Sequence, residues 1–229
     1  MQTRTWRGWS TKTLAARVDR PDTWPAEVEW HATGQVLAAA PAGWLAQGVA
    51  YSRHRSKESY SGYAWVMPMY IPFDSLVLSW SLQLSQPVGG RNFTTPAGVT
   101  DAPAADELAH AFNLAGREHV ERVGTLEGFL ARTASHQRKV LEETGGFWHA
   151  EEVGYTLLLL GRYVDAARQL DRQRVHEADE DREWVTASRE RCGLVLDLLL
   201  QEPDRAIDQL AEWAGQTAAV LDLTWTRPG

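Results

Sequence analysis

Two short groups of side chains in this sequence have the types that bind metal ions or move protons. His149 and Glu152 are three residues apart, so on a helix they would lie on one face and could share a metal ion. No third ligand accompanies them at a metal-site spacing. The acidic run 176–181 lacks the alternating oxygens and the glycine of a calcium loop. We therefore expect a helix start at the first group and a solvated turn at the second, and we predict neither a metal ion nor a cofactor.

Cys192 is the one candidate nucleophile with nearby cations, since Arg189 and Arg191 precede it closely and cations lower a thiol pKa. The sequence becomes apolar from Leu194 onward, so a half-buried structural thiol is the interpretation we favour. A single cysteine excludes an internal disulfide. Nucleophile-elbow and glycine-rich phosphate motifs are absent. No catalytic residue is assigned, and enzymatic activity has no support in the sequence.

The one basic group is Arg53, Arg55 and Lys57, with Tyr51 before it and Tyr60 and Tyr63 after it. At the tip of a hairpin it could contact phosphates while the tyrosines stack on bases. A solvated loop that discourages pairing between sheet edges is the alternative. Three cations give a weak electrostatic attraction, so nucleic acid is not the partner that we expect.

Charge is distributed unevenly along the chain. Residues 1–100 carry nine Lys and Arg against six Asp and Glu, whereas residues 101–229 carry fourteen against twenty-four. An acidic half repels nucleic acid and attracts basic partners. The acids that we single out as a candidate binding surface are Glu151, Glu152, Asp165 and Asp208.

These residues must be positioned by two kinds of element. Alternating polar and apolar residues with many aromatics predict antiparallel strands. The four segments with this pattern are Gln35–Ala39, Trp44–Ser52, Tyr63–Ile71 and Leu76–Leu84. They predict a four-stranded antiparallel sheet with one apolar face, which another layer must cover.

Helical periodicity prevails after a connection, residues 89–105, that is rich in Gly, Pro, Thr and Ala. A short helix is also predicted at Ser10–Arg17. The six helices predicted after the connection are Asp106–Val123, Leu126–Glu143 with Thr125 as its cap, Trp148–Leu160, Tyr163–Ala178, Glu180–Gln201 and Pro203–Leu221. The fold class is therefore α+β, with a sheet region at 1–88, a linker at 89–105 and a helical region at 106–229.

Two segments forty residues apart are similar to each other, Leu158–Leu170 and Leu198–Leu210. The first, with Leu160-Gly161-Arg162-Tyr163 followed by Ala166 and Leu170, resembles the turn of a tetratricopeptide hairpin. The second keeps Ala206 and Leu210 but has Gln201 and Pro203 where that motif has Gly and Tyr. The resemblance implies helical hairpins of the kind that bind polypeptides.

The sheet half has a second resemblance, carried by Met67-Pro68-Met69-Tyr70-Ile71-Pro72 and Leu76-Val77-Leu78-Ser79-Trp80. It is similar to bacterial proteins of unknown function in which an α+β unit precedes helices. This resemblance implies the architecture and a bacterial source, and it implies no activity.

The sequence therefore predicts a non-enzymatic bacterial interaction protein that binds a polypeptide, preferably a basic one, through its acidic helical surface. Neutralising a toxin is compatible with such a binder. The alternative is a hydrolase or nucleic-acid-processing enzyme with its site between sheet and helices. No signal peptide and no apolar run of membrane-spanning length occurs, so we expect a cytoplasmic protein; its oligomeric state stays open.

Overall fold

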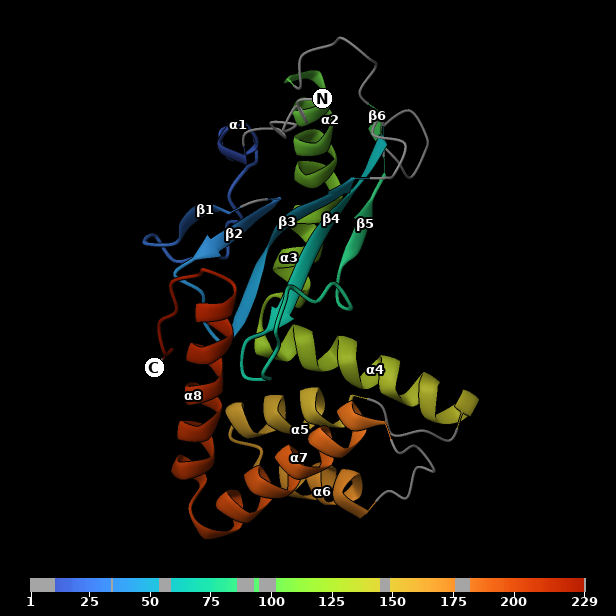
Figure 1. Ribbon diagram of the computed structural model, residues 1–229, viewed down its shortest axis with the longest axis vertical. Helices are drawn as coiled ribbons and strands as arrows, with labels where there is room; N and C mark the ends of the chain where they lie inside the picture. The colour runs from blue at the N-terminus through green and yellow to red at the C-terminus, as the bar shows by residue number, and fades with distance from the viewer. Residues whose placement is uncertain are drawn as a thin grey trace, which may run out of the picture.

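The fold combines an N-terminal antiparallel sheet with a set of helices that follow it, so the predicted α+β class is confirmed (Figure 1). The computed structural model describes residues 11–33, 35–53, 59–85, 93–94, 102–144, 149–175 and 182–228. Residues Arg55 and Lys57, the acidic run 176–181 and most of the predicted linker lie outside these ranges.

Among the described residues the sheet contains six strands, rather than the four that the sequence predicts. They are β1 (Glu29–Thr33), β2 (Val36–Ala40), β3 (Leu45–Arg53), β4 (Ser59–Pro68), β5 (Leu82–Leu84) and β6 (Phe93–Thr94). The first five form an antiparallel meander in chain order, and β6 pairs with β4. The sequence does not predict β1 or β6. β1 has only five residues with a single tryptophan, and β6 has only two residues, so neither shows an alternation long enough to recognise.

The long hairpin of β3 and β4 forms the centre of the sheet. Its register runs from Leu45 opposite Pro68 to Arg53 opposite Tyr60. The strand predicted over Leu76–Leu84 is wrong in its first half, since only its last three residues form β5. Leu78 and Ser81 form a turn instead, in which the backbone N–H and the hydroxyl of Ser81 both donate to the Leu78 carbonyl at 3.1 and 2.6 Å.

The described helices match the predicted ones closely. They are α1 (Thr11–Ala15), α2 (Ala102–Ala111), the π-helical turn η1 (Phe112–Gly116), α3 (Arg117–Val123), α4 (Leu126–Thr144), α5 (Ala150–Leu159), α6 (Tyr163–Val175), α7 (Glu183–Gln201) and α8 (Pro203–Val220). Because α2, η1 and α3 are continuous, six helical segments follow the sheet. The first begins at Ala102, inside the range predicted as a linker. Thr125 caps α4 as predicted, accepting a hydrogen bond of 3.0 Å from the Gly128 N–H.

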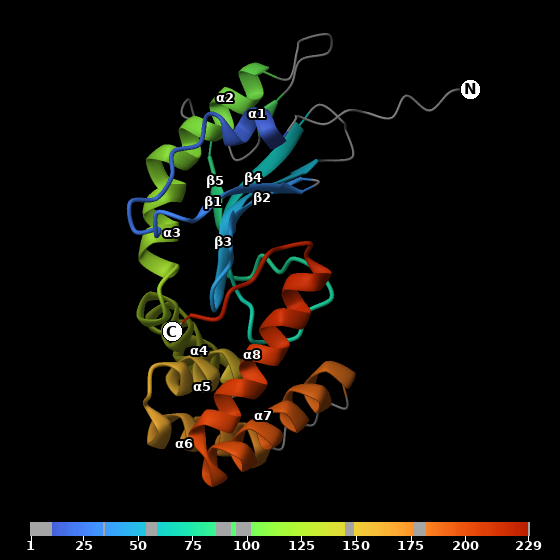
Figure 2. The ribbon, with the colours of Figure 1, turned by 90° about the vertical axis from the view of Figure 1, so that its left-hand side faces the viewer.

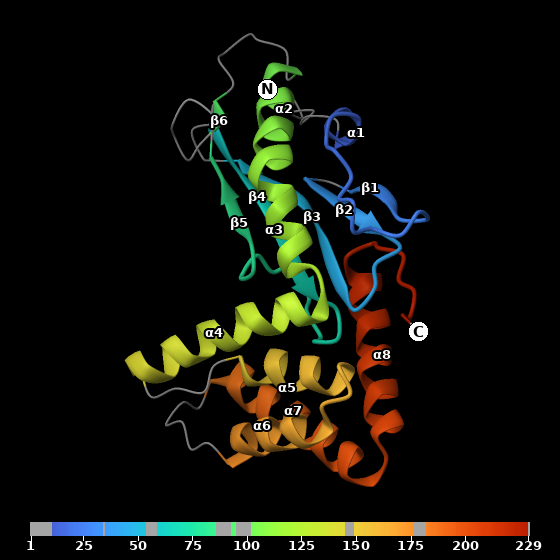
Figure 3. The same ribbon diagram turned by 180° about the vertical axis from the view of Figure 1, so that it is seen from behind.

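The helices cover the sheet in two places. Seen from behind, α2 and α3 run along one face of the sheet (Figure 3). Helices α4 to α7 stack beyond one end of the sheet, with α5 between α4 and α6 (Figure 2). Helix α8 runs beside this stack and points toward the sheet. Each helix buries an apolar stripe against its neighbours, which is the expected source of its stability.

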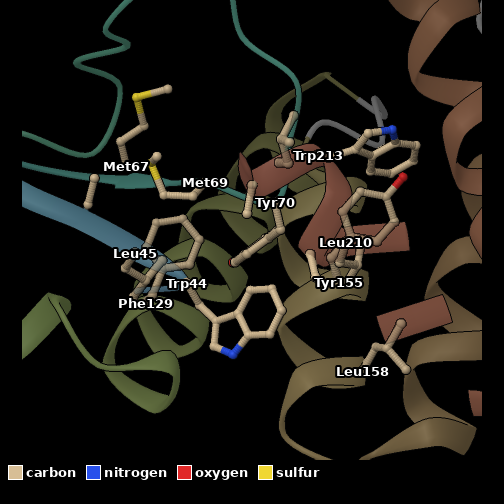
Figure 4. Packing of buried hydrophobic residues seen from close by; sticks show 14 of the residues in the cluster. Trp44, Leu45, Met67, Met69, Tyr70, Phe129, Tyr155, Leu158, Leu210 and Trp213 are labelled. Atoms are coloured by element: carbon tan, nitrogen blue, oxygen red, sulfur yellow. The ribbon is translucent and has the colours of Figure 1, made fainter. Parts of the chain in front are cut away.

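Two apolar clusters form the core, and both contain sheet and helix residues. The smaller cluster joins strands β2 to β4 to α1, α2 and α3. The larger one joins the opposite face to the helical stack. Met69 and Tyr70, which directly follow β4, belong to it together with Phe129, Tyr155 and Trp213 (Figure 4). The sheet and the helices are therefore packed as one body.

A segment after α8 returns to the sheet. The Ala42 N–H donates to the Thr224 carbonyl at 2.7 Å, and the Thr226 N–H donates to the Ala42 carbonyl at 2.9 Å. Between them, the Trp225 indole N–H donates to the Gly43 carbonyl at 3.1 Å, and its ring packs edge-on against Trp44. We call residues Thr224–Thr226 the returning segment.

Candidate functional site

Helix α5 carries two of the four acids predicted to bind a partner, and it contacts the connection between β4 and β5 through Tyr70. It packs against α4, α6 and α8. His149, the residue before it, has a left-handed backbone with φ of 66°, which is uncommon for a residue other than glycine. Polar side chains in the first two turns of α5, Glu151, Glu152 and Thr156, each contact a different neighbour. This helix therefore positions several candidate functional groups.

Glu151 is buried in an ion pair and does not lie on a surface. Arg191 of α7 donates to it in a bidentate arrangement, with Nε to Oε1 at 2.7 Å and Nη2 to Oε2 at 2.8 Å. The Tyr155 hydroxyl donates to Oε1 at 3.3 Å. Burial raises the pKa of Glu151, and the hydrogen bonds from Arg191 act in the opposite direction. This carboxylate therefore links α5 to α7 and is not exposed to a partner.

Cys192 lies beside this ion pair and is fully buried. The Tyr155 hydroxyl is 4.0 Å from its sulfur. Burial raises the pKa of the Cys192 thiol far above its usual value, and the negative charge of Glu151 raises it further. The thiol is protonated at neutral pH, so the geometry favours the structural role over the nucleophilic one.

Glu152 pairs with His149, and this pair joins a cluster of rings. The Glu152 Oε1 atom is 3.0 Å from Nδ1 of His149. The His149 ring lies 4.6 Å from the ring of Trp80 and 5.1 Å from that of His136. Trp80 and His136 are 5.7 Å apart. We call His149, Glu152, Trp80 and His136 the imidazole cluster.

A third histidine holds the backbone of this cluster. His119 of α3 is buried, and its Nε2 is 3.1 Å from the Trp80 carbonyl. Burial lowers the pKa of His119, and the charges of Arg122 and Arg132 lower it further. The neutral imidazole therefore donates to this carbonyl and fixes Trp80. Within the described residues, no group of three or more His, Cys, Asp or Glu side chains could hold a metal ion.

Tyr70 and Thr156 connect α5 to the sheet. Their hydroxyl oxygens are 2.6 Å apart, and the Thr156 hydroxyl also donates to the Glu152 carbonyl. Because Thr156 has a single hydroxyl proton, Tyr70 must be the donor in the first bond. Burial raises the pKa of Tyr70, which keeps that proton in place.

The other two predicted acids lie on different helices, and Asp208 is exposed whereas Asp165 is partly buried. Asp165 of α6 accepts from Arg162 at 2.8 Å and lies 3.5 Å from Arg168. Asp208 of α8 accepts from Arg227 at 2.8 Å. The structure brings Glu151 and Glu152 together on α5 but does not join them to Asp165 or Asp208. Each of the four acids has a cationic or imidazole neighbour.

A recess of about 500 Å³ lies between α4 and the turn from α5 to α6. Its apolar lining residues are Leu130, Ala131, Ala134 and Leu160. The charged side chains of Glu127 and Arg162 complete the lining. We call these six residues the α4 groove; Asp165 lies next to it through its bond to Arg162.

The predicted basic hairpin is described only at its base. Arg53 ends β3, whereas Arg55 and Lys57 lie outside the described residues. Tyr51 and Tyr60 pack against each other with ring centres 6.4 Å apart, and both are buried. Buried rings cannot stack on bases, so these two tyrosines do not support the nucleic-acid hypothesis, whereas the third predicted tyrosine, Tyr63, is only partly buried.

Sequence reasoning missed the imidazole cluster and the α4 groove. His119, His136 and Trp80 come from three elements, and no spacing in the sequence indicates that they meet. The groove residues of α4 do share one face at intervals of three and four, which is a signal that could have been read. Leu160 and Arg162 could have been placed beside them only with knowledge of how α4 packs.

None of the described helices is long and apolar enough to cross a membrane. Comparison of the chain with protein-family models, with curated proteins and with solved structures gave no match. The resemblances found in the sequence rest on the residues that carry them.

Proposed function

We propose that this protein is a non-enzymatic interaction protein that binds a polypeptide in the α4 groove. The observation that carries the proposal is the groove itself, an open recess lined by four apolar and two charged residues. Such a recess suits one or two aliphatic side chains of a partner, with polar groups fixing their orientation.

The surroundings of the groove support a macromolecular partner. Tyr163 and Val164 at the start of α6 follow directly on the groove residue Arg162, and their side chains are 39% and 72% exposed. Exposed apolar side chains next to a recess are typical of interaction surfaces. The contact area available to a partner is thus larger than the recess alone.

We also infer that α5 to α8 are tetratricopeptide-like hairpins. Gly161 in the first turn has φ of 71°, a conformation that favours glycine. The repeated positions Ala166, Ala206, Leu170 and Leu210 are all fully buried. Equivalent burial at equivalent positions supports two related hairpins, whose outer surfaces are available for a partner.

The alternative, an enzyme with its site between sheet and helices, has one observation in its favour. His149 and Glu152 form an imidazole–carboxylate pair at that junction, as a general base and its orienting group would. The His149 ring, however, packs directly against Trp80 and His136. These ring contacts leave the His149 side chain only 22% exposed, so we put polypeptide binding first.

The test is selection of binding peptides with a variant that fills the groove. A random peptide library is selected on the native protein, and each selected peptide is titrated against Ala131→Trp and Arg132→Trp. Ala131 lines the groove, whereas Arg132 is exposed on the opposite side of the same helix. We expect peptides with an aliphatic anchor, bound at least about tenfold more weakly by Ala131→Trp and unchanged by Arg132→Trp. Peptides that bind all three proteins equally would disprove binding in the groove.

A further inference from the structure

Helix α7 has two opposite faces of different character. The inner face carries the buried residues Val185, Ser188, Cys192, Val195, Leu196 and Leu199. At 100° per residue these positions centre on the side opposite Glu190. The outer face carries three exposed acids at intervals of seven residues, Glu183, Glu190 and Asp197. Helix α7 therefore presents a regular acidic row to solvent.

Within the described part of the chain, the charges of this row are not paired. None of the three carboxylates has an ion-pair or hydrogen-bond partner among the described residues, in contrast to Glu151 and Asp165. Carboxylates about 10 Å apart along one helix face repel each other, and salt screens much of this repulsion. A cationic partner would remove that repulsion.

Apolar side chains lie within and beside the acidic row. Leu194 stands between Glu190 and Asp197 on the same face and is 45% exposed. Leu200 and Trp184, near the two ends of α7, are 71% and 49% exposed. A face that combines acids with exposed leucines differs from a purely solvated face, because burial of the leucines would stabilise a complex.

We propose that the outer face of α7, defined by Glu183, Glu190, Leu194, Asp197 and Leu200, binds a basic amphipathic helix. Acids seven residues apart are about 10 Å apart along the axis. A partner helix with Lys or Arg at the same interval can therefore meet each of them, and its aliphatic residues can cover Leu194 and Leu200. Charge complementarity selects the partner and sets its register. Phosphate-rich partners are repelled by the same row.

This surface is separate from the α4 groove, which lies on other elements. The inference rests on the proposed function only in that both surfaces take polypeptides. Either surface can exist without the other, and variants of one leave the other intact.

The experiment uses a labelled synthetic peptide of about 20 residues that is helical, with lysines seven residues apart and leucines beside them. A second peptide has glutamate in place of each lysine. Binding to the full chain is measured by fluorescence anisotropy in about 50 mM salt and again in about 500 mM salt. We expect the basic peptide alone to bind, and to bind more weakly at the higher salt concentration.

Three variants assign that binding to the face. Glu190→Lys combined with Asp197→Lys should weaken it by about tenfold or more, and Leu194→Ser should weaken it without changing any charge. The matched control is Asp74→Lys combined with Glu118→Lys, two exposed acids on other elements, and we expect it to bind normally. All substituted side chains are exposed, and circular dichroism verifies that each variant is folded.

Two results would overturn the proposal. One is equal weakening by the α7 reversal and the control reversal, which would show attraction to overall charge. The other is unchanged binding in the α7 reversal or no binding at all in the native protein. The Ala131→Trp variant should bind the basic helix normally, and the α7 reversal should bind the groove peptides normally, so failure of one proposal is distinguishable from failure of the other.

Discussion

At the scale of single residues, the buried pair of Glu151 and Arg191 is the contact with the largest expected effect on stability. Two charges with side chains only 10% and 25% exposed have lost most of their hydration, and each depends on the other to offset that cost. An acid-rich sequence suggested Glu151 as a binding residue. The burial of Glu151 cannot be predicted from the residues next to it in sequence, because Arg191, the cation that pairs with it, is forty residues away.

Replacing Arg191 with Met should lower the free energy of unfolding by about 3 kcal/mol at pH 7, because Glu151 stays buried without its cation. The double variant Glu151→Met and Arg191→Met should recover most of that loss, since no charge is then buried. Urea denaturation provides the measurement.

The control for this pair is Arg162→Met, which removes an exposed pair with Asp165 and should cost no more than about 0.5 kcal/mol. If Arg191→Met lowers the free energy of unfolding as little as Arg162→Met does, the buried pair contributes no more to stability than the exposed one.

At the scale of elements, two helical glycines have opposite surroundings. A Cβ at Gly154 of α5 would lie 2.5 Å from Cδ2 of Leu170, so the absence of a side chain lets α5 and α6 approach. A Cβ at Gly215 of α8 would meet no atom within 4 Å. Only the first glycine is needed for packing.

We expect Gly215→Ala to raise the free energy of unfolding by about 0.5 to 1 kcal/mol through higher helix propensity. Gly154→Ala should lower it by about 1 to 2 kcal/mol, because overpacking against buried Leu170 outweighs that gain. The measurement is thermal or urea unfolding of the two variants. Equal changes in the free energy of unfolding for Gly154→Ala and Gly215→Ala would contradict the close approach of α5 and α6.

Helices were predicted better than strands, and the reason is visible in particular segments. Thr125 and Pro203 mark helix starts by local chemistry that tertiary packing does not change. Leu76, Leu78 and Trp80 alternate as a strand would, yet they lie in an irregular connection whose apolar side chains pack on the core. Alternation reports burial on one side, and it does not report whether a neighbouring strand pairs with the backbone.

At the scale of the whole molecule, the shared clusters make sheet and helices one cooperative unit. The joint position of His119, His136 and His149 around Trp80 is a product of this packing, so it could not be derived from any segment alone. The same holds for the α4 groove, whose lining comes from α4 and from the turn after α5.

Trp225→Ala tests this unity, since the residue fastens the segment after α8 to the sheet. We expect a loss of about 2 kcal/mol, less than for a fully buried tryptophan, with fluorescence and circular dichroism still reporting one coincident transition. The exposed residue Val220 supplies the control, and Val220→Ala should change stability by less than about 0.5 kcal/mol. Two separate transitions in the native protein would contradict a single unit.

The returning segment also has a consequence for the order of assembly. Trp225 meets Gly43 across 182 residues of chain, so the ribosome makes the corner of the sheet long before it makes the segment that completes it. A contact this distant in sequence closes late, because its loop entropy is recovered only after the intervening elements have formed. Until then the backbone groups of Ala42 and the ring of Trp44 lack the contacts that the returning segment provides. We expect the nascent sheet to be most accessible to chaperones, and most prone to mispairing, during that interval.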